Sequence, residues 1–184
     1  MKLFALDFAL DFFSKLRTRQ KVVVALAAFM LVLFFAAKMA FWALVFIFAA
    51  SIAEIYNNEF RTPVHFDLVK LGTILTSVSY GAPPGIFVGL ASTFFSKLFS
   101  SRLNPTIIIS FLGIIIIAVL ADLFSETSIT KLGIILVAVY YLITSPLNLL
   151  MGEEPAYAIA YVASSLAVNI TLFLVVAPML IGIM

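Results

Sequence analysis

The feature that most constrains this chain is a run of 32 residues, Val22 to Ala53, that contains neither glycine nor proline and only one charged residue, Lys38. About 20 apolar residues cross the hydrocarbon core of a bilayer, so the run fits one tilted helix or two short ones broken near Lys38. A lysine at mid-membrane costs about 2.5–3.5 kcal/mol, and the Leu, Ile, Phe and Val residues offset this at about 0.3–0.6 kcal/mol each. We favour one long helix, because nothing in the run supplies a turn.

The composition of the whole chain supports a membrane environment. Hydrophobic residues make up 64% of the sequence and charged residues 11%, whereas soluble domains average about 25% charged residues. In water the excess apolar surface would form large exposed patches, so membrane lipid is the expected surrounding. The net charge of +2 gives no reason to expect nucleic acid as a partner. With no cysteine and one histidine, we expect no disulfide, no metal site and no cofactor.

Five further apolar segments follow the first, each separated by polar or proline-containing stretches. The clearest break is Gly81-Ala82-Pro83-Pro84-Gly85, where two prolines remove backbone donors and disfavour helix in the residues before them. The expected fold is therefore all-α, a polytopic membrane bundle of about six transmembrane helices in one domain, residues 22–184. The segments after the first are expected at residues 67–80, 86–99, 106–120, 132–151 and 156–184, with a kink at Pro146 and with Pro178 inside the last segment.

Residues 1–21 are predicted to form an amphipathic helix, because Asp7, Asp11 and Lys15 share one face at helical spacing. Two interpretations stay open, a helix in the headgroup plane and a cytoplasmic extension of the first membrane helix. The basic residues of 15–21 place the N-terminus in the cytoplasm by the positive-inside rule. We therefore expect a multi-pass protein of the cell membrane. Its loops at 54–66, 100–105 and 152–155 would face outward, unless the first run forms two helices.

Small residues recur every four positions at Gly81, Gly85 and Gly89, and again at Ala36 and Ala40. Such spacing lets two helices approach closely and gain packing contacts that lipid does not provide. It predicts either packing within the bundle or a docking face for a partner protein.

Polar side chains gather in the loops that are expected to face outward. Loops held by a rigid bundle often form binding sites, although any membrane protein presents polar loops to water. Adjacent Glu153 and Glu154 diverge by about 100° on a helix, which favours a solvated turn over a catalytic pair, and His65 is expected to be exposed. The candidate substrate-binding residues are Asn57, Glu59, Arg61, His65, Asp67, Glu153, Glu154, Tyr157, Tyr161 and Asn169.

Within the predicted spans, the polar outliers are Lys38, Asp122, Asn148 and Asn169. Ionisable groups inside a membrane suggest function, whereas the two asparagines suit hydrogen bonds between helices. No catalytic motif and no nucleotide-binding loop is found, so we expect neither an enzyme nor a chain that drives transport by ATP hydrolysis alone.

The region from Phe66 to Leu98 resembles the substrate-binding S components of energy-coupling factor transporters. Those proteins show an aspartate, a short helix of small and apolar residues, a Gly-Pro turn and a small-residue helix ending near a charged residue. The matching residues here are Asp67, Gly72, Gly81, Pro83, Gly85, Gly89 and Lys97. The resemblance implies a six-helix subunit that captures a vitamin-like micronutrient from outside and docks, through small-residue faces, on a membrane coupling protein driven by two ATPases.

Two alternatives belong to other functional classes. The same layout is similar to MreD, a small membrane scaffold of the cell-elongation machinery, which implies no ligand and small-residue faces that bind other membrane proteins. The third alternative is an accessory subunit of a larger membrane complex.

Overall fold

The computed structural model describes residues 37–57, 66–99 and 104–184. The predicted N-terminal helix of residues 1–21, the start of the first apolar run and Ala36 lie outside these ranges. The chain divides into two compact units, Met1–Lys38 and Met39–Met184. The packed helices described below belong to the second unit, apart from Ala37 and Lys38 at the start of the first of them.

Every regular element in the described residues is an α-helix, which agrees with the predicted all-α class. A helix over Ala37–Asn57 is followed by α3 (Val69–Tyr80), α4 (Ala82–Phe99), α5 (Ile107–Leu123), α6 (Ile129–Leu150) and α7 (Pro155–Ile181). Three of them are long and apolar enough to cross a membrane, namely Ala37–Asn57, α6 and α7. Large apolar side chains such as Leu142, Leu150 and Ile159 are exposed on these helices, as expected for surfaces that face lipid.

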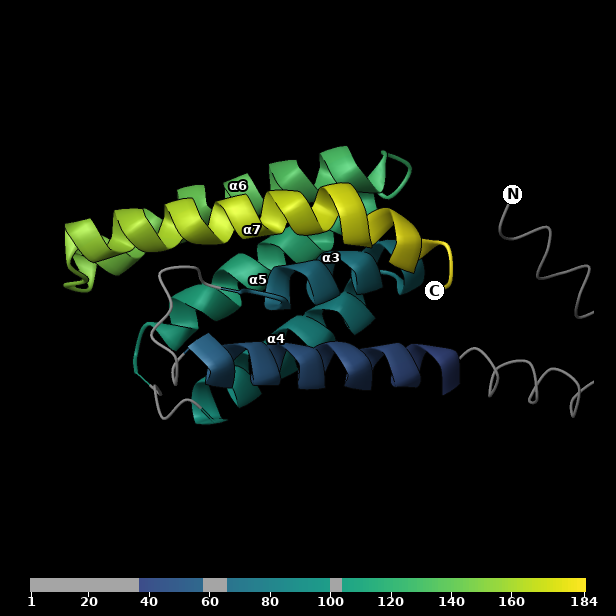
Figure 1. Cartoon of the computed structure of the whole chain (residues 1–184), viewed down its shortest axis with the longest axis horizontal. Helices are drawn as coiled ribbons and strands as arrows, with labels where there is room; N and C mark the ends of the chain where they lie inside the picture. The colour runs from purple at the N-terminus through teal and green to yellow at the C-terminus, as the bar shows by residue number, and fades with distance from the viewer. Residues whose placement is uncertain (1–36, 58–65, 100–103) are drawn as a thin grey trace, which may run out of the picture. The chain divides into compact units, whose positions relative to one another are not determined.

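Helix α3 is the centre of the second unit. It packs against α4, α5, α6 and α7 (Figure 1), and every residue from Lys70 to Ser77 is buried. Twelve residues make a helix of about 18 Å, well short of a hydrocarbon core of about 30 Å. Because its neighbours surround it, the polar residues of α3 are kept from lipid by protein. This burial explains why the segment is less apolar than the other helices.

The junction between α3 and α4 lies at Gly81, and α4 begins at Ala82, four residues before the start that we predicted for this segment at residue 86. Gly81 has φ 95° and ψ 169°, a region that essentially only glycine occupies. Pro83 and Pro84 then lie in the first turn of α4, where a missing N–H costs no helical hydrogen bond. The two prolines therefore begin the helix and do not interrupt it.

Replacing Gly81 with Ala should lower the free energy of unfolding by about 1–3 kcal/mol, because the side chain disfavours this backbone conformation. No steric clash contributes, since a Cβ atom would lie 3.9 Å from its nearest neighbour, Pro83. Denaturant titration of the purified protein measures the change. Gly182→Ala is the matched control, because Gly182 has φ −71° and a Cβ atom there would make only ordinary van der Waals contacts. Equal stability of the two variants would contradict the prediction.

The later helices begin and end within a few residues of their predicted limits. Helix α6 continues through Pro146, and α7 through Pro178. The last two helices form a hairpin, α6 and α7, that packs along its length (Figure 1). Two glycines allow close packing around this hairpin: a Cβ atom on Gly133 would overlap the ring of Phe173, and one on Gly113 would lie 2.6 Å from the ring of Tyr140.

Candidate functional site

A buried ion pair lies where α3 begins. Asp67 precedes the helix, and its Oδ1 accepts a hydrogen bond of 3.2 Å from the Val69 amide. Lys70, one turn later, reaches back to Oδ2 of Asp67, and only 2% of its side chain is exposed. The Lys70 ammonium is therefore the counterion of the Asp67 carboxylate.

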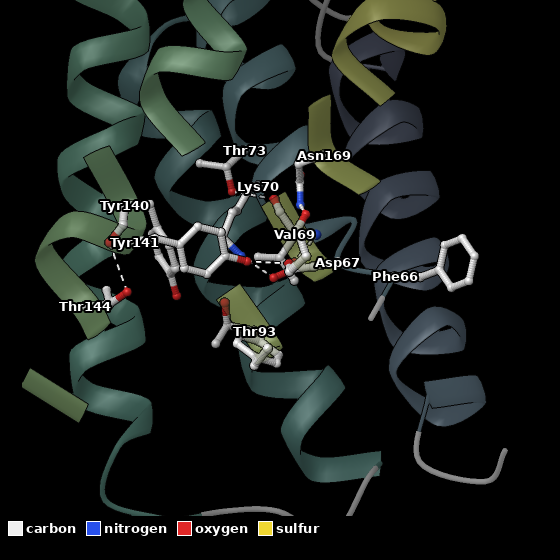
Figure 2. A network of polar contacts seen from close by, with 12 residues as sticks. Phe66, Asp67, Val69, Lys70, Thr73, Thr93, Tyr140, Tyr141, Thr144 and Asn169 are labelled. Carbon is white, nitrogen blue, oxygen red and sulfur yellow. Dashed lines mark hydrogen bonds and ion pairs between the residues drawn. The ribbon is translucent and has the colours of Figure 1, made fainter. Parts of the chain in front are cut away.

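Two tyrosines of α6 complete the surroundings of the Lys70 ammonium (Figure 2). Its Nζ lies 4.3 Å from the ring centroid of Tyr140 and 4.6 Å from that of Tyr141, within the range of a cation–π interaction. The Tyr141 hydroxyl donates a hydrogen bond to Oγ of Ser165 in α7. The Asp67–Lys70 pair thus connects α3 to α6 and, through Tyr141, to α7.

A second ion pair joins the Ala37–Asn57 helix to α4. Nζ of Lys97 lies 3.1 Å from Oε1 of Glu54, and both side chains are partly buried. Close by, the side-chain amide of Asn57 donates to the Phe66 carbonyl at 2.9 Å and accepts from the Phe66 amide at 3.1 Å. Asn57 therefore holds the start of the Asp67 region against the end of the preceding helix.

These groups surround two polar cavities. The large polar cavity has a volume of about 180 Å³ and the small polar cavity about 60 Å³. Glu54, Lys97, Ser110, Tyr140 and Tyr161 line both of them, so the two cavities are adjacent. The small cavity also contacts Asp67, Lys70 and Ser96, and the large one Glu153, Tyr157, Asn148, Tyr141, Asn104 and Thr106.

The cavities occupy one end of the bundle. The large cavity is lined by residues from the end of the Ala37–Asn57 helix, the end of α4, the start of α5 and the α6–α7 turn. The opposite end is marked by Gly81 near Asp122 and by the hydroxyl of Tyr80, which donates to the Met184 carbonyl at 3.0 Å. Glu54, Asn104 and Glu153, described residues of the three loops that the sequence grouped on one side, therefore line the same cavity.

The structure brings together four of the candidate binding residues. Glu153, Tyr157 and Tyr161 line the large cavity, and Asp67 and Tyr161 the small one. Three other candidates, Glu59, Arg61 and His65, lie outside the described residues.

The remaining candidates have other positions. The Asn57 side chain forms two hydrogen bonds with the backbone of Phe66. Glu154 is exposed and directly precedes α7. Asn169 is buried in α7, where its side-chain amide donates 2.9 Å to the Ser165 carbonyl of the same helix. The expected hydrogen bond of Asn169 to another helix is thus replaced by one within α7.

The candidate packing residues divide into three kinds. A Cβ atom on Gly85 would overlap Ser77 of α3, and one on Gly89 would overlap Ile114 of α5, so both glycines pack within the bundle. Gly81 forms the turn before α4. Ala40 lines an apolar groove of about 780 Å³ between its helix and α4.

Sequence reasoning did not select five residues of the site as binding residues, namely Tyr140, Tyr141, Lys70, Glu54 and Lys97. Lys70 carried a usable signal, because it is an ionisable residue three positions after Asp67 in a segment predicted to be helical. Glu54 and Lys97 are 43 residues apart, and no local pattern shows that they meet. In the described residues no group of three or more His, Cys, Asp or Glu side chains is arranged to hold a metal ion.

No protein-family model matches the chain, and comparisons with curated proteins and with solved structures give no match either.

Proposed function

We propose that this protein is the substrate-recognition subunit of a membrane transporter that takes up a small, vitamin-like molecule and works with a separate ATPase module. In this proposal the bundle crosses the cell membrane six times, with its N-terminus in the cytoplasm. The large polar cavity then opens toward the outside, the helices bind and position the solute, and no chemical step takes place in this chain.

The observation that carries the proposal is a polar cavity enclosed by otherwise apolar helices. Binding sites for small molecules are concave and contain a few placed polar groups, and polar residues within membrane bundles mark solute pathways. Asn148 Oδ1 and Ser96 Oγ are buried without a hydrogen-bond partner in the described structure, and each belongs to a residue that lines one of the cavities. Buried polar atoms of this kind favour a bound polar molecule, because an unsatisfied polar group costs about 1–3 kcal/mol.

Native mass spectrometry of the gently purified protein tests this function. We expect a small-molecule adduct on the wild-type chain and its loss from Ala158→Phe, because Ala158 is buried against the large cavity and a larger side chain fills it. Ala163→Phe is the matched control, since Ala163 is exposed on the same helix. The absence of any adduct, together with no binding of candidate micronutrients at micromolar concentration, would contradict the proposal.

A membrane scaffold without a ligand is the second candidate, and the apolar groove at Ala40 favours it. Apart from Ser51, whose hydroxyl donates 2.8 Å to the Ile47 carbonyl, the groove is lined by apolar side chains, and such a surface suits a partner helix. Identification of the proteins that co-purify with this chain from the native membrane distinguishes the two functions. Two ATPases with one membrane coupling protein support transport, whereas cytoskeletal or membrane proteins without ATPase motifs support the scaffold.

A further inference from the structure

We propose that the large polar cavity selects a small organic cation, either a protonated amine or a quaternary ammonium. This inference rests on the proposed recognition function and names the chemical class of its ligand. It follows from the charges, the aromatic rings and the hydrogen-bond acceptors of the described residues around the cavity.

Among the described residues that line the two cavities, one carboxylate has no ion-pair partner. Glu54, Asp67 and Glu153 are the acidic lining residues, and Lys70 and Lys97 the basic ones. Both lysines are already paired, Lys70 with Asp67 and Lys97 with Glu54. Among the described residues the Glu153 carboxylate makes no ion pair. A bound cation would neutralise its charge, whereas a bound anion would have to displace Glu54 from Lys97.

Four tyrosines, Tyr140, Tyr141, Tyr157 and Tyr161, line the large cavity. The faces of aromatic rings attract ammonium groups, and rings grouped around a pocket are the usual means of binding a quaternary ammonium. Tyr140 and Tyr141 already hold a cation, because the Lys70 ammonium lies over both rings. Tyr157 and Tyr161 stack with their centroids 6.3 Å apart and add two more rings next to Glu153.

The unsatisfied atoms favour a ligand that donates hydrogen bonds. Asn148 Oδ1 accepts no hydrogen bond in the described structure, and the Glu153 carboxylate can only accept. A volume of 180 Å³ equals the space of about six water molecules. The cavity therefore suits a compact cation with an N–H or O–H donor better than a large cofactor.

Calorimetric titration of the purified full chain in lipid nanodiscs with three matched probes tests the inference. Choline is the cation, 3,3-dimethyl-1-butanol is its neutral carbon analogue, and 3,3-dimethylbutanoate is the anion of similar shape. We expect choline to bind at least about tenfold more tightly than the alcohol, since only the cation gains cation–π contacts with the tyrosine rings, and we expect the carboxylate not to bind.

Two substitutions locate the cation. Glu153→Gln should weaken choline binding about fivefold and weaken binding of the neutral alcohol less, because the lost charge attracts only the cation. Tyr157→Leu should weaken choline binding to a similar extent. Asp122→Asn is the matched control, because Asp122 is an exposed carboxylate of α5 near Gly81 at the other end of the bundle.

The outcomes separate this inference from the function on which it rests. Binding of the alcohol or the carboxylate as tightly as choline overturns the preference for a cation and leaves the recognition function standing. Binding of none of the three probes, together with no adduct in native mass spectrometry, overturns both.

Discussion

Replacing Lys70 with Met is expected to lower the free energy of unfolding by about 3–5 kcal/mol, the usual cost of removing one partner of a buried ion pair. The substitution leaves the Asp67 carboxylate buried without its counterion and removes the ammonium from the rings of Tyr140 and Tyr141. The loss of a mere surface lysine costs far less, about 0–1 kcal/mol. Denaturant titration in mild detergent, followed by helical circular dichroism, measures the difference.

Two further variants show whether the buried charge is the cause. Lys131→Met is the matched control, because Lys131 is exposed in the first turn of α6, and we expect it to retain wild-type stability. The double variant Asp67→Asn/Lys70→Met should recover part of the loss, since it removes the unpaired carboxylate along with the lysine. If Lys70→Met is as stable as Lys131→Met, the ion pair does not stabilise this fold.

The sequence was sufficient for the helical class and for most helix limits, because long apolar runs and proline-containing breaks are local signals. It also placed Glu153, Tyr157 and Asp67 in one group, since alternating helices bring every second loop to the same end. The central position of α3 could not be predicted from the sequence. A 12-residue helix with Lys70 and several hydroxyl residues differs little, in sequence alone, from a short membrane span.

The partners of the charged residues were also beyond sequence reasoning. Lys97 meets Glu54, and Lys70 meets two tyrosines of α6, through contacts between helices that are distant along the chain. Such pairs depend on how α3 sits among its neighbours, which only the packed structure defines. For Asn169 the sequence suggested a hydrogen bond to another helix, but its side-chain amide donates to the Ser165 carbonyl one turn earlier in α7.

Gly89→Leu is expected to lower the melting temperature of the isolated protein strongly, because Gly89 is enclosed by its own chain. Even a Cβ atom there would overlap Ile114 and come within 2.5 Å of Thr73 Oγ1, and overpacking of this kind costs about 1–3 kcal/mol, or more where the backbone must shift. Thr73 is fully buried in α3, so the leucine would push α4 away from both α3 and α5. Thermal unfolding followed by circular dichroism measures the loss.

Gly182→Leu is the matched control, because a Cβ atom at Gly182 lies 3.6 Å from its nearest neighbour, and we expect it to unfold at the wild-type temperature. The comparison also separates the two roles predicted for the small residues. If Gly85 and Gly89 served only to dock a partner, Gly89→Leu would leave the isolated chain as stable as Gly182→Leu and impair only its assembly. Instability without any partner present instead shows that these glycines hold α4 against α3 and α5, the packing on which the walls of both polar cavities depend.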